Sequence, residues 1–446
     1  MSLTPGDAVT VACGAGFAGD RVEPAVDAAR SGLVDTVVLE CLAERTLVGG
    51  LQARRRDPAA GYDTRLRRRL TPLLPVARAT GTRVVSNLGS ANPAAAAEEV
   101  ARLGRELGLT GLRVAAVLGD DVAASTDRVS WSGEPPADPD AWLGVHAYLG
   151  MEPIAQALAE GADVVLTGRV ADSALFAAPV AARRDLDDAG IAAATTIGHL
   201  LECSGQLTGG NLADLRRPPL PAATYADLGF PLASVDADGS AEIWVLPGKP
   251  ARLDVVGCTL QLLYEVHDPR AYLTPDTALD LSGVRFEEVG ENRIRVTGAA
   301  GRPRPERLKA VGFRQGREMV ADMEMAYAGE GCVTRARTAA ETMTLRLQSL
   351  GIERLRADLV GVDSVLWEAA ERQSSAVEPA EVRMHVSAVC ADADLAQAVE
   401  DELYALTLSG PAGGCGMRSE RRPHVETRDG LIDRDLVPTT LAWATA

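Results

Sequence analysis

Five short apolar runs in the first 170 residues constrain the fold more than any other feature of the chain. Each is five or six residues long, is rich in β-branched side chains and lacks the apolar–polar alternation of a half-exposed strand. The runs are Val9–Cys13, Thr36–Glu40, Arg83–Asn87, Arg113–Leu118 and Asp163–Thr167. Helical segments separate them, among them the amphipathic stretch 93–107. The alternation predicts an α/β fold whose parallel sheet of βαβ units has its active site at the carboxyl ends of the strands.

The pattern changes after Pro218, Pro219 and Pro221. Longer and more polar strands follow, and 236–239 and 290–292 have the composition of hairpin turns. The strands expected in this β-rich section are Ala241–Leu246, Leu253–Val266, Val284–Glu288 and Arg293–Val296. We therefore predict an α/β domain at 1–220, which carries the active-site crevice, and a second domain at 221–446.

The carboxyl-terminal part of the second domain is predicted to be a smaller α+β unit. Its expected elements are helix Val333–Leu350, strands Asp358–Val365 and Val382–Val389, and helix Ala393–Leu408. A helix–strand–strand–helix order flanked by further strands is typical of a ferredoxin-like unit. The predicted fold class is thus a parallel βαβ sheet domain, a β-rich section and a ferredoxin-like α+β unit.

Charge and cysteine usage exclude several classes of protein. The chain has 446 residues with 45 basic and 62 acidic side chains, a net charge of −17. A surface with this negative charge would repel phosphate backbones and anionic lipids. We therefore expect neither nucleic acid nor a membrane as a partner. The seven cysteines form no CxxC pair, which suits a reducing compartment. Because no signal peptide and no stretch of about 20 apolar residues is recognisable, we predict a cytoplasmic protein.

A glycine-rich turn with Gly14, Gly16 and Gly19 directly follows the first apolar run. Glycines there permit a tight turn and let backbone N–H groups approach an anion at a helix amino terminus. Glu40 ends the next run, where a dinucleotide-binding fold places the acid that binds ribose. NAD(P) binding is therefore one interpretation. The alternatives are that the turn serves another ligand or only packs the helix against the strand.

The ends of the second and third runs carry further candidates. Glu40 and Glu44 could divide acid and base roles, or Glu44 could pair with a nearby arginine on the surface. Asn87 is a candidate ligand for carbonyl or hydroxyl groups of a substrate. Asn92 immediately precedes Pro93, so we predict that it is the N-cap of a helix.

The fifth run leads directly into Arg169, Asp172 and Ser173. In so acidic a chain, an arginine at the end of a buried strand is a natural anchor for a carboxylate or a phosphate. We predict that these three residues bind substrate. The alternative is a structural ion pair between Arg169 and Asp172.

The strongest acid–base candidates follow the fifth run. If the segment is helical, His199, Glu202 and Cys203 share one face, which sets a base against an acid or a thiol. The loop that follows allows close approach of a ligand and contains Gly209, Gly210 and Asn211. A helix-terminal histidine without a catalytic role is the alternative. The chain has no HExxH motif, and no metal site is predicted.

Six blocks carry a family resemblance: ACGAGFAGDR, VVLECLAERT, VVSNLGSANP, DVVLTGRVADSALFAAP, HLLECSGQLTGGNLAD and QLLYEVHDPRAYLTPD. They resemble the acyclic terpene utilisation family, long described as a domain of unknown function and associated with bacterial breakdown of citronellol- and geraniol-type compounds. The resemblance spans about residues 5–430 and implies branched acyl intermediates as CoA thioesters, with a lyase, hydratase or isomerase step. One departure is 247–250, Pro-Gly-Lys-Pro, where relatives carry a Gly-Thr-Gly-Gly-like turn. If this turn contacts ligand, the substrate differs from a terpenoid acid.

These features together predict a cytosolic catabolic enzyme for a small, anionic, branched acyl substrate, such as an acyl-CoA. Arg169 would hold the anion, Glu202 and His199 would move protons beside the substrate carbonyl, and Glu40 would assist. The alternatives are an NAD(P)-dependent oxidoreductase and a non-catalytic ligand-binding protein or enzyme-complex subunit. The cofactor is left open.

We also expect a homo-oligomer. The β-rich section presents apolar strand faces at Leu260, Leu262 and Leu263 within a highly charged chain, and oligomers commonly bury such surfaces.

Overall fold

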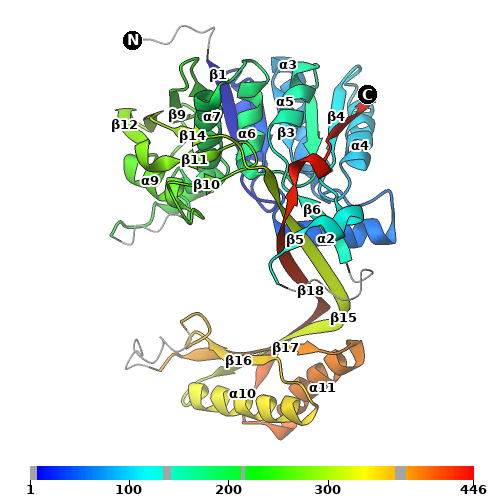
Figure 1. The fold of residues 1–446 in the computed structure, drawn as a ribbon. Helices are drawn as coiled ribbons and strands as arrows, with labels where there is room; N and C mark the ends of the chain where they lie inside the picture. Colours follow the sequence, from blue (N-terminus) through cyan, green and yellow to red (C-terminus); the bar gives the residue numbers. More distant parts are fainter. Residues whose placement is uncertain (1–7, 134–141, 212–215, 367–377) are drawn as a thin grey trace. The chain divides into compact units, whose positions relative to one another are not determined.

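The computed structural model describes residues 8–133, 142–211, 216–366 and 378–446, which are drawn in Figure 1. They form two compact units. The described part of the first unit is 8–133, 143–211, 216–312 and 428–446, and that of the second is 142, 313–366 and 378–427.

A ten-stranded sheet forms the centre of the first unit. Its parallel part has the order β1-β2-β3-β7-β4, and these strands are the five apolar runs of the sequence. They are β1 (Val9–Ala15), β2 (Thr36–Leu39), β3 (Arg83–Ser86), β7 (Val164–Thr167) and β4 (Arg113–Leu118). Nearly all of their residues are buried, as helices on both faces require. The predicted α/β class is confirmed.

Antiparallel strands extend this sheet at both edges. At one edge β8 pairs with β1 and is followed by β9, β13 and β12, and at the other edge β19 pairs with β4. These strands are β8 (Pro231–Val235), β9 (Ala241–Val245), β12 (Arg285–Gly290), β13 (Arg293–Thr297) and β19 (Thr440–Thr445). The predicted turns connect β8 to β9 and β12 to β13. The compact units therefore do not divide at 220/221 as predicted, because the strands of the β-rich section continue the parallel sheet and belong to the same unit.

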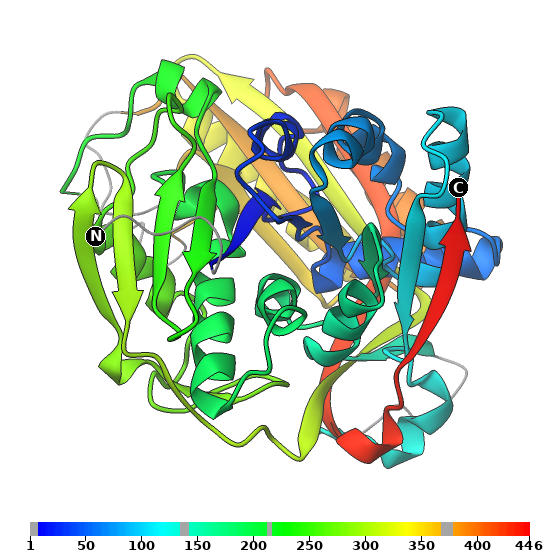
Figure 2. The same cartoon turned by 90° about the horizontal axis from the view of Figure 1, so that it is seen from above.

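Helices lie on both sides of the sheet, as Figure 2 shows. One layer contains α1 (Glu23–Arg30), α3 (Leu66–Thr80) and α4 (Pro93–Glu106), and the other contains α5 (Glu152–Ala159), α6 (Asp172–Ala181) and α7 (Asp188–Leu201). Asn92 caps α4 as predicted, since its side chain accepts the Ala95 N–H at 3.3 Å. None of the helices in the described ranges is long and apolar enough to span a membrane.

One predicted strand is a helix. The stretch 253–266 was expected to be extended, but it contains α9 (Val255–Leu263), whose N-cap Asp254 accepts the Gly257 N–H at 2.8 Å. A short apolar run suits a buried strand and a helix equally, so periodicity did not separate them. As a result Leu262 is buried, whereas Leu260 and Leu263 are exposed on the helix.

Shorter elements complete the first unit. The helical ones are α2 (Glu44–Arg56), α8 (Ala222–Ala226), η1 (Ala123–Arg128), η3 (Ser204–Gln206), η4 (Leu281–Gly283) and η6 (Arg434–Leu436). A small sheet contains β10 (Tyr272–Leu273), β11 (Ala278–Asp280) and β14 (Ala300–Arg302).

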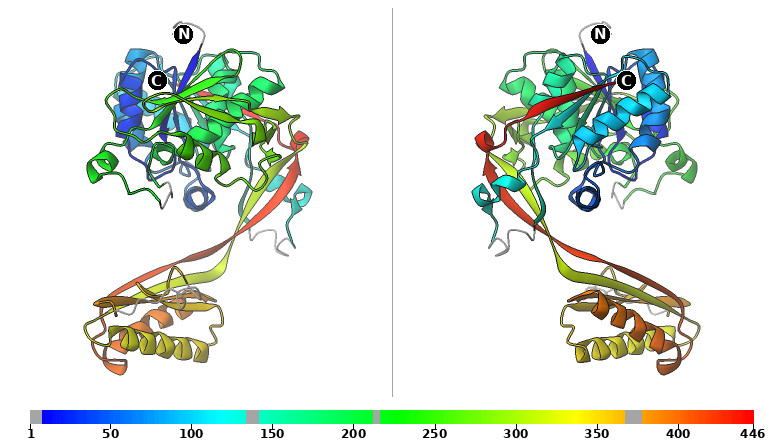
Figure 3. Two further views of the ribbon diagram at one scale, coloured as in Figure 1. Left: turned by 90° about the vertical axis from the view of Figure 1, so that its left-hand side faces the viewer. Right: turned by 90° about the vertical axis from the view of Figure 1, so that its right-hand side faces the viewer.

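The described part of the second unit is a sheet covered by two helices. β17 (Glu381–Cys390) lies antiparallel between β16 (Leu355–Val360) and the long strand β15 (Arg307–Ala328). The long strand β18 (Cys415–Asp433) lies on the other side of β15, as Figure 3 shows. The helices α10 (Cys332–Ser349) and α11 (Ala393–Ser409) close one core with this sheet.

The expected helices of this unit are confirmed, and β16 begins and ends earlier than predicted. The described elements follow in the order β15-α10-β16-β17-α11-β18, and a ferredoxin-like topology stays a prediction. Within the two long strands, β18 also pairs with β5 (Ser130–Trp131), and β15 also pairs with β6 (Trp142–Ala147).

Candidate active site

Polar side chains gather where four neighbouring parallel strands end. Glu40 follows β2, Asn87 follows β3, Arg169 lies just after β7, and Asp120 lies just after β4. Because these strands are parallel and adjacent in the order β2-β3-β7-β4, the four residues lie side by side at the carboxyl ends of the strands. All four are buried. Three of them were predicted site residues; Asp120 was not.

Glu40 is a buried carboxyl group held by two hydrogen bonds. Its Oε1 accepts the Leu42 N–H at 2.8 Å and the Asn87 amide at 3.0 Å. Asn87 in turn accepts the Cys41 N–H at 2.6 Å, so its amide orientation is set. Burial and the charge of Asp172 raise the pKa of Glu40 to about 8, although Asn87 and Arg169 oppose the shift. Glu40 is therefore mostly protonated at neutral pH.

Arg169 is a buried guanidinium with capacity to bind an anion. It donates to the Leu42 carbonyl, and its carbon Cζ lies 4.3 Å from the centre of the Tyr148 ring. Its ion pair with Asp172 is long, at 3.5 Å, so the predicted alternative of a structural pair is also present. Its Nε has no hydrogen-bond partner among the described residues.

Tyr148 and Glu44 flank this arginine. The Tyr148 hydroxyl donates to Glu44 at 2.7 Å, and Lys309 lies 3.1 Å from the same carboxylate. The hydrogen bond from Tyr148 and the charge of Lys309 outweigh burial and lower the pKa of Glu44. Glu44 thus forms an ion pair, as the alternative expected, but its partner is Lys309 and not an arginine. Tyr148 was missed, because its position gives it no signal in the sequence.

Asp172 and Ser173 begin α6. Burial raises the pKa of Asp172, against the opposing charge of Arg169. Ser173 is buried at the contact with α7, where its main chain occupies the space that a Cβ of Gly198 would need. The structure therefore places Ser173 at a helix–helix contact.

His199 and Glu202 form the pair that their spacing predicted. Nδ1 of His199 lies 2.9 Å from Glu202 Oε1, and Nε2 lies 3.3 Å from the Leu262 carbonyl, to which it donates. Burial lowers the pKa of His199, but Glu202 outweighs this effect and the pKa is raised. Burial raises the pKa of Glu202 against the opposing charge of His199. A proton shared between Nδ1 of His199 and the carboxyl group of Glu202 is consistent with a raised pKa for both groups.

Asp172 influences both groups of candidate residues, Glu40 with Arg169 and His199 with Glu202. Asp172 pairs with Arg169, and its charge raises the pKa of both Glu40 and Glu202. Burial, followed by the charge of Glu202, raises the pKa of the Cys203 thiol. Glu40, Arg169 and Glu202 therefore all lie within electrostatic range of Asp172.

The glycine-rich turn packs against the same region. A Cβ on Gly16 would lie 2.5 Å from the Glu202 carbonyl, and a Cβ on Gly14 would lie 2.8 Å from side chains of α1 and β2. The Gly16 N–H donates to the Asp20 carboxylate at 3.0 Å, which places a negative charge where a phosphate would bind. A Cβ on Gly19 would meet the Phe17 ring. This geometry gives the three glycines packing roles and offers no support for the NAD(P) alternative.

The loop with Gly209, Gly210 and Asn211 leads back to His199. Gly209 has a φ of +111°, which favours glycine, and the Gly210 N–H donates to the Gly205 carbonyl at 2.7 Å. The Asn211 amide donates to Gln206, Gln206 donates to Gln261, and Gln261 donates to the His199 carbonyl. The loop thus supports the helix that carries His199.

A second buried pair, Asp120 and His146, was not predicted. Nδ1 of His146 lies 2.9 Å from Asp120 Oδ2, which also accepts the Arg169 N–H at 2.7 Å. Asp120 follows an expected strand, so the strand-end rule that selected Glu40 and Arg169 could have found it. His146 has no such signal.

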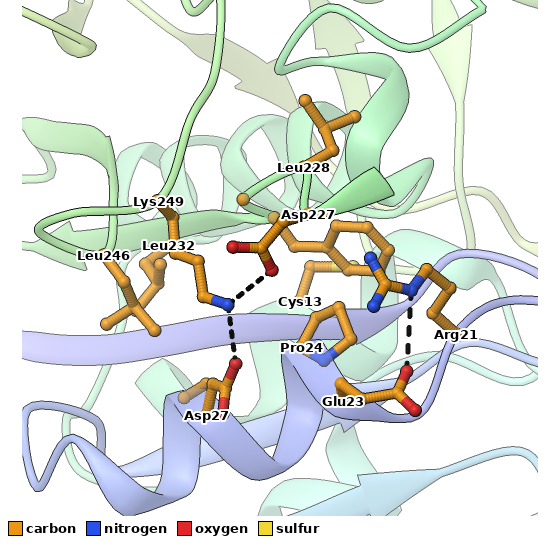
Figure 4. A pocket seen from close by; sticks show the side chains of 13 residues that line it. Cys13, Arg21, Glu23, Pro24, Asp27, Asp227, Leu228, Leu232, Leu246 and Lys249 are labelled. Carbon is orange, nitrogen blue, oxygen red and sulfur yellow. Dashed lines mark hydrogen bonds and ion pairs between the residues drawn. The ribbon is translucent and has the colours of Figure 1, made fainter. Parts of the chain in front are cut away.

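Two other features are not part of this site. Figure 4 shows a hollow between α1 and the start of β8, in which Lys249 lies between Asp27 and Asp227 at 2.9 and 2.7 Å. Its free volume is about 10 Å³, which suits one water molecule and no substrate. In the described part of the second unit, Glu318, His424 and Glu426 have a metal-ligand spacing, but Arg354 pairs with Glu318 and Arg314 with Glu426.

The fold and the site define an α/β protein with a buried arginine–carboxyl–histidine centre at the carboxyl edge of its parallel sheet. The chain belongs to the acyclic terpene utilisation family (AtuA), whose family model matches residues 9–443. No curated protein matches it. Among solved structures it is similar to a homoserine dehydrogenase from Thiobacillus denitrificans at 12% identity, over 90% of this chain and 84% of that one. The TM-score of 0.15 is too low to support any conclusion about fold or function.

Proposed function

We propose that the protein is an enzyme of acyclic terpene breakdown that moves protons on a small, anionic, branched acyl compound. The observation that carries this proposal is the arrangement of buried polar groups: Glu40 is hydrogen-bonded to Asn87, Arg169 is paired with Asp172, and His199 contacts Glu202 at 2.9 Å. Groups with shifted pKa values that converge at a sheet edge are typical of acid–base catalysis.

Arg169 has the role of the anchor. Its buried guanidinium stacks on Tyr148, and its Nε lacks a hydrogen-bond partner in the described ranges. A substrate carboxylate or thioester oxygen would use this donor, and the low dielectric of the site would strengthen the contact. Protonation of Glu40 limits the repulsion that so many carboxyl groups would otherwise exert on an anion.

Glu40 and the His199–Glu202 pair have complementary proton roles. Glu40, with a pKa of about 8, holds a proton that it can donate at neutral pH. The His199–Glu202 pair shares a proton and can accept or return one beside the substrate carbonyl. Donation at one position and acceptance at another is the chemistry of a lyase, hydratase or isomerase, and the acyl-CoA form is the substrate we favour.

Two variants test the proposal on citronellol- and geraniol-derived acids and their CoA thioesters. Arg169→Lys keeps the charge but loses the planar fork, so it should weaken binding more than it slows turnover. Glu202→Gln cannot accept a proton, so it should reduce turnover by about 10²–10⁴-fold and leave binding within a few-fold.

The matched controls are Arg30→Lys and Glu106→Gln, which alter exposed ion pairs on helices of the same unit. Both should behave like the wild type. Small and equal effects of Arg169→Lys and Glu202→Gln on binding and turnover would reject the catalytic assignment and favour a ligand-binding protein.

A further inference from the structure

Asp120 and His146 form a buried acid–base pair that the proposed function leaves unused. The side chain of His146 is 1% exposed and that of Asp120 is 5% exposed. Their 2.9 Å contact joins Nδ1 to Oδ2. In a neutral imidazole this contact sets the tautomer, because a carboxylate accepts only from Nδ1–H and the lone pair is then on Nε2.

Nε2 of His146 has no hydrogen-bond partner among the described residues, although it is buried. A buried polar atom without a partner costs about 1–3 kcal/mol, so native proteins rarely retain one without a use. A Cβ on Gly144 would lie 2.6 and 3.0 Å from the two methyl groups of Leu51 and 3.4 Å from this nitrogen, so Leu51 packs closely against Gly144 beside the ring of His146. A ligand with a hydroxyl group would supply the hydrogen bond that this nitrogen lacks.

The pair is attached to the candidate active site by hydrogen bonds. Oδ2 of Asp120 also accepts the Arg169 N–H at 2.7 Å, so one oxygen joins the imidazole to the main chain of the anchor. Asp120 occupies the space that a Cβ of residue 168 would need, and the residue there is glycine. Asp120 and Arg169 lie at the ends of the adjacent strands β4 and β7, where ligands of parallel sheets bind.

We propose that His146 is a second proton acceptor of this site and that the substrate carries a hydroxyl group on the acyl chain held by Arg169. In this step the substrate O–H bond breaks, its proton moves to Nε2, and the electron pair stays on the substrate oxygen. Nδ1–H stays bonded to Asp120, whose charge stabilises the imidazolium ion. The inference rests on the proposed function, because Arg169 must first hold the acyl end.

Two small probes separate the hydroxyl contact from the anion contact. 3-Hydroxy-3-methylbutyrate and 3-methylbutyrate have the same branched carboxylate and differ by one hydroxyl group. Calorimetric titration of the full-length protein should show that the hydroxy acid binds roughly fivefold to tenfold more tightly, as one hydrogen bond to an otherwise unpaired buried acceptor provides.

Two variants of one residue identify the atom responsible. His146→Asn keeps a donor near Nδ1 for Asp120 and removes Nε2, so the two acids should bind equally. His146→Gln places a polar atom near Nε2 and should retain part of the preference. A purely structural histidine would change the melting temperature in these variants and leave the ratio of the two affinities unchanged.

Nitrogen-15 NMR of the five histidines gives a readout that needs no variant to fold. In the wild type, the hydroxy acid should shift the Nε2 resonance of His146, whereas that of the exposed His267 should stay in place. The acid without a hydroxyl group should shift neither resonance by a comparable amount.

The outcomes distinguish the two proposals. Equal binding of both acids by the wild type, or a preference that survives in His146→Asn, would overturn the role of His146 while leaving Arg169 as the anchor. Failure of both acids to bind, or binding that Arg169→Lys does not weaken, would overturn the anchor and with it the inference.

Discussion

Glu40 binds a proton more tightly in the folded protein than in the unfolded chain. Its pKa rises from an ordinary value of 4.5 to about 8, mainly through burial. The stability that this group contributes is therefore complete below about pH 4.5 and is lost as the pH rises through 8. Glu40→Gln mimics the protonated form, so the variant should gain a few kcal/mol on the wild type between pH 5 and pH 8 in urea unfolding.

Glu106→Gln is the control for this experiment. The hydrogen bond from Arg67 lowers the pKa of Glu106, so its smaller contribution is lost as the pH falls, which is the opposite sign. Parallel stability curves for the wild type and Glu40→Gln would show that Glu40 is ionised in the folded protein.

Gly16 and Gly49 form a matched pair for testing the glycine-rich turn. A Cβ on Gly16 would meet the main chain of 202–204 at 2.5–2.7 Å, whereas Gly49 lies in α2 with open space around it. Gly16→Ala should therefore destabilise the protein by about 1–3 kcal/mol and displace Glu202. Gly49→Ala should be neutral or stabilising by up to about 1 kcal/mol.

Thermal unfolding and the His199 resonances report both effects. If Gly16→Ala unfolds like the wild type and leaves the His199 signals in place, the turn does not pack against Glu202 as the structure describes. Loss of ligand binding without loss of stability would instead revive the nucleotide interpretation of the turn.

At the scale of elements, α9 carries the prediction of a homo-oligomer. The leucines expected on a strand face lie on a helix, where Leu260 is 41% and Leu263 is 47% exposed. Tyr264 and Leu273 are further exposed apolar side chains of the first unit. Light scattering should give at least twice the 46.7 kDa of one chain, and Leu263→Asp should reduce the mass. A mass of one chain for the wild type would contradict the prediction.

The elements differ in how far local sequence determines them. The helix α4 was predicted because Asn92, Pro93 and an amphipathic pattern all agree. The helix α9 was not, because its apolar run is short and its cap at Asp254 was overlooked. The pairing of His199 with Glu202 was predicted correctly, because residues three positions apart on a helix lie on the same face.

At the scale of the whole molecule, the edges of the large sheet decide how the chain divides. β8 and β19 come from distant parts of the sequence and close opposite sides of the same parallel core. Their pairing moves the β-rich section into the first unit, so a boundary drawn at the change in composition did not match the compact units.

Local patterns were sufficient for the parallel strands, the α/β class and the strand-end positions of Glu40, Asn87 and Arg169. These properties follow from residues close together in the chain, because apolar runs separated by helical segments can be recognised from the local sequence. The Asp120–His146 pair, the pKa of Glu40 and the antiparallel edges depend on contacts between residues far apart in sequence. Burial and distance between such residues exist only after the chain has folded, so the tertiary structure alone decides which of the charged groups hold a proton and which of them meet.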